Sequence, residues 1–288
     1  MSSPLWIGRW HRILEPLAEM TGFRPRRLRR RDQAAAAFAR SQGVRGVYVE
    51  NALASGEFDG WAFERAGELA CIAWFGPRGN LVVVCDPAAA GHEEAVIAQI
   101  MASGSSWRIA LGDAVIVDAL RLRMQRSVLA HRDQVYYAGR AEDATSALVR
   151  GDVRAPAAAD RERLARATLA LNASDLNIAP ERVDRRWLYR TIDERCRDGS
   201  TRVIGPPGDV WCKVDFGSCG AGGAVLEGVY TFPEHRGRGY AASLVASLLA
   251  AADGETSLHV ADHNVAARRA YEAAGMRAAG RCRLLLLG

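Results

Sequence analysis

Long apolar runs are missing from this sequence of 288 residues, and none approaches the ~18 residues that a membrane-spanning helix needs. Residues 1–10 also lack a basic segment ahead of an apolar stretch, which a secretory signal would have. We therefore expect a cytoplasmic protein that has no membrane partner.

Lysine is almost absent. Lys213 is the only one, so the 38 basic residues behind the net charge of +5 are nearly all arginine. Together with the many alanines, this is typical of GC-rich bacterial coding, and the charge alone does not predict nucleic-acid binding. The densest basic run, from Arg24 to Arg31, contains no aromatic residue on which a base could stack. We predict a solvated, partly strand-like face there, with contact to a phosphate backbone as the alternative.

Cysteine motifs are absent as well. None of the six cysteines belongs to a C-x-x-C pair, and no histidine clusters near them. They are Cys71, Cys85, Cys196, Cys212, Cys219 and Cys282. This spacing argues against a zinc site and favours reduced thiols in a cytosolic protein, so we expect no metal.

The composition is that of a folded protein, with 49% hydrophobic and 25% charged residues. The length allows two domains of ordinary size. The polar, small-residue segment 141–146 is the best linker, which gives predicted domains of residues 1–145 and 150–288.

The most informative segment runs from Val229 to Ala241 and reads Val-Tyr-Thr-Phe-Pro-Glu-His-Arg-Gly-Arg-Gly-Tyr-Ala. It begins as a β-type run, Pro233 marks the end of that strand, and good helix formers follow. Between them, Gly237 and Gly239 allow a tight turn and the close approach of a ligand to the backbone. A strand, a glycine-rich turn and a helix start predict an anion-binding cradle, because the N–H groups and the helix dipole both favour negative charge.

The turn lacks both the Gly-Lys-Ser/Thr end of a Walker loop and the spacing of the dinucleotide-binding GxGxxG. Residues 236–241, Arg-Gly-Arg-Gly-Tyr-Ala, instead resemble the acyl-CoA pyrophosphate loop of the GNAT superfamily of N-acetyltransferases, whose pattern is Gln/Arg-x-x-Gly-x-Gly/Ala. A second block, from Asn264 to Met276, is similar to the family's Asn-x-x-Ala-Arg-x-x-Tyr-Glu-x-x-Gly-Phe, with methionine in place of the final phenylalanine. The helix 265–274 is also predicted locally, since Asn264 is a good N-cap and Gly275 a good residue after a helix end.

This resemblance, close over residues 200–287, implies an α/β protein with the mixed sheet of the acyl-CoA N-acyltransferase (GNAT) fold. The N-terminal half has a similar order of elements, so we predict a tandem of two GNAT-like domains. At the corresponding cradle position it has residues 85–91, where no Arg-Gly-x-Gly occurs and Asp86 would repel phosphate. We therefore expect a degenerate N-terminal domain that has lost acyl-CoA binding, followed by a catalytic one.

Periodicity and turn residues predict the individual elements. In the N-terminal half we expect a helical lead-in over 1–22, helices over 32–40 and 48–55, strands over 60–65, 69–75 and 80–85, and a helix capped by Asp86. In the C-terminal half we expect strands over 153–156, 200–205, 209–216, 223–231 and 258–260, and helices over 157–170, 184–198, 241–252 and 265–274. The strand 223–231 should splay apart from the strand after the cradle helix, which in this family forms the slot for pantetheine.

The resemblance implies acetyl-CoA as cosubstrate and assigns residues to its binding. Backbone groups of Val229, Tyr230 and Thr231 would meet the thioester and pantetheine, and N–H groups of Gly237, Gly239, Tyr240 and Ala241 would meet the pyrophosphate. Arg236 and Arg238 could add charge, or one of them could be solvated. Asn264 either binds the pantetheine arm or caps its helix, and Arg268 either reaches the 3′-phosphate or forms a surface pair.

Tyr271 lies at the position of the family's tyrosine, which implies that it protonates or positions the leaving thiol. A tyrosine hydroxyl can donate a proton to a thiolate when both are removed from water. The alternative is a core tyrosine that packs its helix.

Acyl transfer to an amine also requires a base, because an amine with a pKa of ~10.4 is almost fully protonated at pH 7. Glu227 precedes Val229 by two residues, so regular strand alternation places both on one face. If that face lines the acceptor slot, the Glu227 carboxylate can take the proton. Otherwise Glu227 faces solvent or pairs with Lys213 or an arginine. The lesser candidates are Asp215, His259 and His263, and ordered water could replace a side-chain base.

We predict an N-acetyltransferase that moves an acetyl group from acetyl-CoA to a primary amine of a small molecule or protein, by direct attack within a ternary complex. The alternatives are a non-catalytic acyl-CoA-binding sensor and an RNA-directed acetyltransferase. The acceptor slot is expected near residues 171–185, where Asp175 and Glu181 would suit a cationic acceptor. The sequence identifies neither that acceptor nor the oligomeric state.

Overall fold

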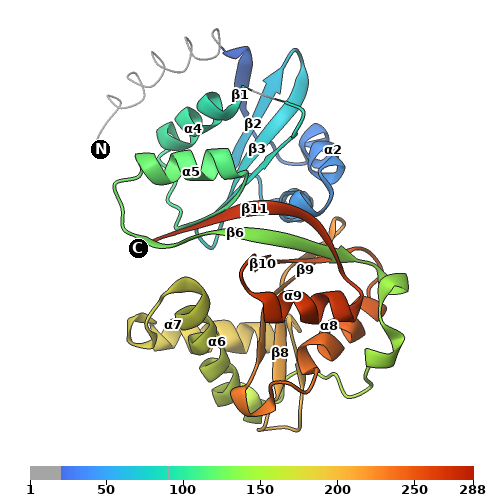
Figure 1. Cartoon of the computed structure of the whole chain (residues 1–288). Coiled ribbons are helices and arrows are strands. Elements are labelled where there is room, and N and C mark those ends of the chain that lie inside the picture. The colour runs from blue at the N-terminus through green and yellow to red at the C-terminus, as the bar shows by residue number, and fades with distance from the viewer. Residues whose placement is uncertain (1–20, 90) are drawn as a thin grey trace. The chain divides into compact units, whose positions relative to one another are not determined.

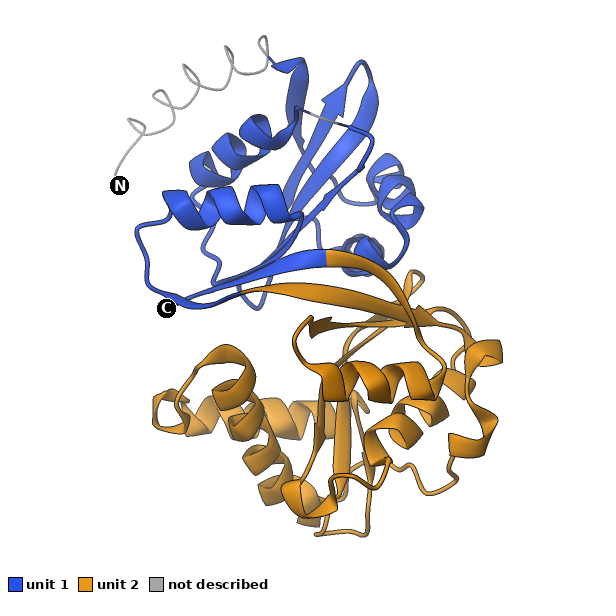
Figure 2. Cartoon of the chain, viewed as in Figure 1, with its two compact units in different colours: residues 1–131, 282–288 blue, residues 132–281 orange. Residues whose placement is uncertain are grey.

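The computed structural model describes residues 21–89 and 91–288. The helical lead-in predicted for residues 1–22 therefore lies almost wholly outside the described residues. Figure 2 shows two compact units, one of residues 1–131 and 282–288 and the other of residues 132–281. No helix in the described ranges is long and apolar enough to span a membrane.

This division differs from the predicted boundary at 145–150. The last strand, β11 (Arg277–Leu287), begins in the second unit, but from Cys282 onward it belongs to the first, where it pairs with β5 (Ile109–Gly112). The predicted linker also packs within the second unit, since the Thr145 N–H donates to the Ala274 carbonyl at 3.1 Å. Both features depend on long-range pairing, for which the sequence has no local signal.

The first unit has a sheet with helices on both faces (Figure 1). Across the sheet its strands are β1 (Phe23–Arg27), β2 (Gly60–Arg65), β3 (Glu68–Gly76), β4 (Asn80–Cys85), β5 and the end of β11. Its helices are α2 (Gln33–Ser41), α3 (Val47–Ser55), α4 (Glu93–Ala102) and α5 (Ala114–Arg123). Ile72 and Trp74 pack with α2 and α3, whereas Ala73 and Phe75 pack with α4 and α5. Burial on both faces explains why β3 is apolar along most of its length.

The second unit repeats this arrangement of layers. Its strands lie in the order β6 (Val128–Gly139), β10 (Thr256–Ala261), β9 (Gly223–Thr231), β8 (Cys212–Gly220) and β7 (Thr201–Ile204). Its helices are α6 (Arg161–Leu176), α7 (Arg185–Arg197), α8 (Tyr240–Ala250) and α9 (Val265–Ala274). Val203 packs with α6 and α7, and the next residue, Ile204, packs with α8 and α9. The two helix pairs therefore cover opposite faces of the sheet.

Most predicted elements are present, and β9 and α9 have the predicted bounds. Two predictions are wrong. Residues 153–156 form no strand, only an isolated bridge between Arg154 and Val203, because Pro156 has no N–H for a ladder. Asp86 caps no helix: its side chain accepts from the Ala88 N–H at 2.9 Å in a turn, and α4 begins only at Glu93.

The prediction of reduced thiols is wrong for one pair of cysteines. Cys71 and Cys85 occupy directly paired positions of β3 and β4, with Cα atoms 4.0 Å apart, and form a disulfide. Strand register brings them together, which the search for C-x-x-C spacing could not detect. The other four cysteines form no disulfide in the described structure.

Candidate active site

The site of the second unit begins where two parallel strands separate. The register of β9 with β10 pairs Thr256 with Ala224, Ser257 with Val225 and Leu258 with Leu226, and these are the only β9–β10 pairs in the described structure. β9 nevertheless continues to Thr231 and β10 to Ala261. The predicted splay is confirmed, and it starts directly after Leu226.

A β-bulge lies at the same point. Glu227 is opposite Asp215 and Tyr230 is opposite Lys213, so β9 advances by three residues where β8 advances by two. Gly228 has φ +58°, a conformation that glycine adopts without the penalty a side chain would bring.

The bulge changes which residues share a face. Leu226 and Val229 pack against the same hydrophobic cluster, although they are three residues apart. The regular alternation that placed Glu227 beside Val229 therefore does not hold, and Glu227 is directed toward β8 and α7 instead.

The predicted anion cradle lies between β9 and α8. Gly237 and Gly239 are exposed and have φ +73° and +75°, and a Cβ atom built on either would meet no other atom within 4 Å. α8 starts at Tyr240 with Gly239 as its N-cap, and no side chain caps its first N–H groups. Open space beside free helix N–H groups suits a phosphate.

The two cradle arginines differ. The Arg236 Nε–H donates to the Thr231 carbonyl at 3.1 Å, and its guanidinium lies 5.8 Å from the centre of the Tyr230 ring. Arg236 thus ties the loop back to β9. Arg238 is exposed at the rim of the turn.

The second family-like block forms α9. The Asn264 side-chain oxygen accepts from the Ala267 N–H at 3.1 Å, so this oxygen caps the helix, as one of the two alternatives predicted. The side-chain N–H₂ group is a separate donor that a ligand could use. Arg268 donates to Asp262 at 2.8 Å and to the Tyr137 hydroxyl at 3.2 Å. These contacts match the surface-pair alternative for Arg268.

Tyr271 is 7% exposed and belongs to the same cluster as Val229 and Tyr240. Burial raises the pKa of Tyr271 above its ordinary value, and the nearby Cys212 and Asp175 groups act in the same direction. The hydroxyl therefore stays protonated across the neutral range and can act only as a donor of its proton, or as a packing group.

Glu227 takes part in a buried network of charges. Arg195, on α7, donates to Glu227 at 2.6 Å and lies 2.5 Å from Asp215, which also pairs with Lys213 and accepts from Thr201. Burial acts to raise the pKa of Asp215, but Lys213 and Arg195 outweigh it and hold the pKa below its ordinary value. Asp215 is thus a fixed anion.

The sequence reasoning missed Arg195. The spacing of the sequence could have indicated it, because Leu188, Ile192 and Arg195 lie on one face of a helix and the first two are buried. An arginine that continues an apolar stripe of this kind requires a buried partner.

The two histidine candidates lie in different surroundings. His259 follows the last β9–β10 pair, and burial lowers its pKa to about 4. The charge of Glu227 acts to raise this pKa, and that of Arg132 acts to lower it. His259 is therefore neutral at pH 7 and able to accept a proton. His263 is exposed in the turn before α9.

The acceptor segment differs from the expected loop. α6 continues through Asp175 to Leu176 and ends with Asn177 at φ +53°. The Asp175 charge contributes to the raised pKa of Tyr271, after burial and Cys212. Glu181 is exposed in a 3₁₀ turn over Pro180–Arg182.

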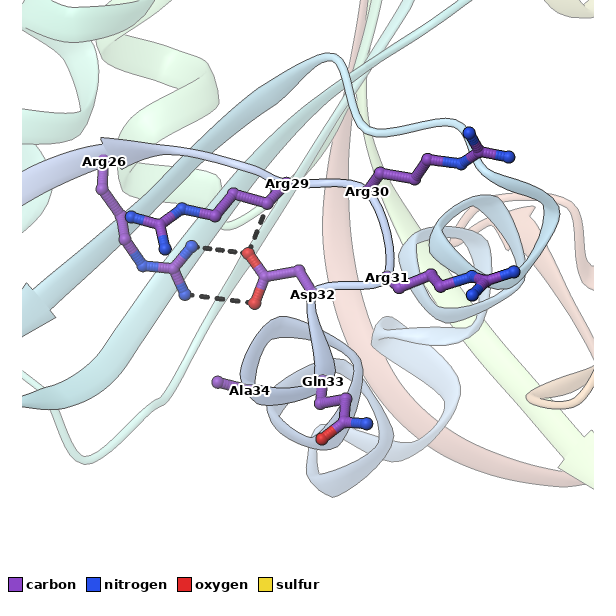
Figure 3. A pocket seen from close by; sticks show the side chains of 7 residues that line it. All are labelled: Arg26, Arg29, Arg30, Arg31, Asp32, Gln33 and Ala34. Carbon is purple, nitrogen blue, oxygen red and sulfur yellow. Dashed lines mark hydrogen bonds and ion pairs between the residues drawn. The ribbon is translucent and has the colours of Figure 1, made fainter.

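The basic run from Arg24 to Arg31 forms most of β1 and the loop after it, so the prediction of a partly strand-like segment is confirmed. Figure 3 shows the pocket there, which has a volume of about 380 Å³. Its lining residues are Arg26, Arg29, Arg30, Arg31, Asp32, Gln33 and Ala34. Arg26 pairs with Asp32 at 2.5 Å and also with Glu64, while Arg30 and Arg31 point away from Asp32. Ion pairing thus occupies part of this basic charge.

Comparisons with known proteins bear on the family and the fold. Residues 208–276 match the acetyltransferase (GNAT) family. No curated protein sequence matches the chain. Among solved structures, a GCN5-related N-acetyltransferase from Sphaerobacter thermophilus has a TM-score of 0.51 at 19% identity, over 92% of this chain and 95% of its own. A GNAT-family acetyltransferase from Colwellia psychrerythraea has a TM-score of 0.50 at 13% identity, over 92% of this chain and 100% of its own.

The predicted likeness to the GNAT superfamily is confirmed for residues 208–276, and so is the fold class, a mixed α/β sheet of the GNAT fold. The structural likeness extends over both halves of the chain. The family match over residues 208–276 supports acyl transfer as the class of activity.

Proposed function

We propose that the protein is an N-acetyltransferase that transfers an acetyl group from acetyl-CoA to a primary amine, by direct attack within a ternary complex. The second unit would be catalytic and the first a degenerate GNAT-like domain. The observation that supports this most is the glycine-lined start of α8 beside the point where β9 separates from β10. The start of α8 suits a diphosphate, and Tyr271, in the same cluster as Val229 of β9, would lie toward the thioester.

The cradle residues fit the cosubstrate. The N–H groups of Gly237, Gly239, Tyr240 and Ala241 would bind its pyrophosphate, because nothing within 4 Å of the glycine Cβ positions obstructs an approach. From Val229 to Thr231, β9 pairs with β8 but has no partner in β10 among the described residues, and this edge would bind the pantetheine amides in the manner of an added strand. When bound, the cosubstrate supplies the activated acyl group as a thioester.

Different residues would carry out the two proton transfers of the reaction. Tyr271 would donate its proton to the leaving thiolate, since desolvation raises the proton affinity of both groups. Glu227 would accept the amine proton, directly or through water. Arg195 already donates a hydrogen bond to the Glu227 carboxylate, and neutral His259, which follows the last β9–β10 pair, is the alternative acceptor.

The ion pair between Arg195 and Glu227 favours one alternative, a binder of acyl-CoA that senses it without turnover. Calorimetry with acetyl-CoA and an assay of thiol release over a panel of small amines and amine-bearing peptides separate the two functions. An acetyltransferase binds the cosubstrate and releases CoA with at least one amine, and Tyr271→Phe slows the release. Binding without turnover for any amine would support the sensor, and no binding would overturn both.

A further inference from the structure

The first unit contains a cluster of metal-ligating side chains that the proposed reaction does not use. Cys71 lies on β3, Cys85 ends β4, and His92 immediately precedes α4. Their ligand atoms all lie within 4.8 Å of one another, and all three residues are buried.

His92 provides a second, independent indication of a ligand. It is 5% exposed, yet neither of its ring nitrogens has a hydrogen-bond partner among the described residues. Its nearest aromatic neighbour is Phe23, whose ring centre is 5.8 Å away and edge-on, and a phenyl ring cannot accept a strong hydrogen bond from it. An unbonded buried polar group costs about 1–3 kcal/mol, which coordination of one nitrogen to a metal would offset.

We propose that Cys71, Cys85 and His92 bind Zn²⁺ when the two cysteines are reduced. Thiolate sulfur and imidazole nitrogen are the ligands that zinc prefers, and three protein ligands leave a fourth position for water. The disulfide in the structure is the oxidised, metal-free form. A two-electron reductant converts it to two thiols, and Zn²⁺ then displaces one proton from each thiol as two Zn–S bonds form.

Charge balance favours zinc over a monovalent thiophilic ion. Two thiolates and a neutral imidazole bring a charge of −2, which Zn²⁺ cancels and Cu⁺ does not. The surroundings are apolar, with Phe63, Val96 and Ile97 in the core cluster that contains both cysteines, and an uncompensated charge there would be unfavourable.

The site also explains the unusual sequence at this point. Cys85 and His92 flank the segment that stands where a GNAT cradle would be expected in the first unit, and that segment lacks the arginine–glycine turn. A zinc ion there would tie the end of β4 and the start of α4 to β3 by direct coordination.

The test uses the full-length protein, reduced with a phosphine under anaerobic conditions and then dialysed against Zn²⁺. Mass spectrometry of the metal content should show a single zinc per chain, and cobalt in its place should give thiolate-to-metal charge-transfer absorption. Cys85→Ser and His92→Phe should weaken zinc binding by ~100-fold or more, because even the loss of a residue that only orients a metal ligand can reach that size. Cys282→Ser, which removes a buried thiol outside the cluster, should bind zinc as the unaltered protein does.

A second measurement does not depend on the folding of any variant. In the unaltered reduced protein, zinc should protect Cys71 and Cys85 from alkylation but leave the reactivity of exposed Cys219 unchanged. Failure of the reduced protein to bind zinc, equal binding by the folded His92→Phe variant, or retention of Cu⁺ alone would overturn the proposal. None of these outcomes bears on acyl transfer by the second unit, so the two proposals fail independently.

Discussion

The Arg195 guanidinium donates to the Glu227 carboxylate at 2.6 Å and so joins α7 to the strand that leads into the cradle. The same guanidinium lies 2.5 Å from Asp215. Burial acts to lower the pKa of Arg195, but the two carboxylates outweigh it and raise the pKa. Glu227 therefore lies where the splay begins, but its carboxylate is held by an ion pair on the side of α7.

Replacement of Glu227 by glutamine tests its role as the base. If Glu227 accepts the amine proton, Glu227→Gln should lower kcat/KM by roughly 100-fold with little effect on acetyl-CoA binding. Steady-state rates at several pH values are the measurement. Glu162→Gln is a suitable control, because Glu162 accepts a hydrogen bond from Tyr189 on the α6–α7 side of the unit. An unchanged rate and pH profile would assign the proton transfer to His259 or to water.

Tyr271→Phe removes only the hydroxyl of the candidate acid. Because its raised pKa keeps this hydroxyl protonated, we expect kcat to fall by roughly 100-fold while the Kd for acetyl-CoA stays nearly constant. Single-turnover kinetics and calorimetry measure the two effects separately. Tyr137→Phe is the matched control, since the Tyr137 ring lies 6.0 Å from that of Tyr271 and its hydroxyl bonds to Glu272. Equal losses in the two variants would indicate a packing role.

The cradle could be predicted from the sequence because its determinants are local. Gly237 and Gly239 adopt left-handed conformations within a few residues of the helix they precede, and Asn264 caps its own helix. The bulge at Gly228 could not be predicted, because it exists only in the register of β9 against β8. The position of Glu227 depends on that bulge. The prediction of its face was therefore wrong because it required the pairing of β9 with β8, which no local pattern shows.

Neither the disulfide nor the pairing of the last strand with the first unit could be predicted from the sequence, and the reason is the same. Cys71 and Cys85 meet only through the β3–β4 register, and residues 282–288 reach β5 across most of the chain. Alternation and turn residues locate a strand, but they do not select its partner. The predicted helices and strands therefore agree with the structure better than the predicted contacts between them.

Gly239→Ala tests the cradle. With φ +75°, an alanine there costs about 1 kcal/mol in backbone strain, and its methyl group would enter the space proposed for the pyrophosphate. We expect acetyl-CoA binding to weaken by about tenfold or more, measured by calorimetry. The control is Gly254→Ala, at an uncrowded glycine that lacks a left-handed φ. Equal heats of binding for the two variants would place the diphosphate elsewhere.

His259 predicts how stability depends on pH. Its pKa is about 4 in the folded protein and about 6.5 in an unfolded chain, so between these values the unfolded state binds more protons. The free energy of unfolding should therefore fall as the pH drops from about 6.5 toward 4, by up to about 3 kcal/mol, and should not change from this cause above 6.5. Urea unfolding at a series of pH values measures the slope. His259→Gln should flatten it, whereas His263→Gln, at an exposed position, should leave it intact.

The only lysine of the chain provides the last prediction. Lys213 is 2% exposed and paired with the buried Asp215, so its amine is inaccessible in the folded protein. Incubation of the native protein with acetyl-CoA or an amine-reactive ester should leave Lys213 unmodified in peptide mass spectra, whereas denatured protein should acquire the label. Modification under native conditions would mean that the charge network opens on the timescale of the assay. If Lys213 stays protected, CoA released without an added amine cannot come from acylation of a lysine on the protein itself, and every lysine product in an acceptor assay must belong to the acceptor.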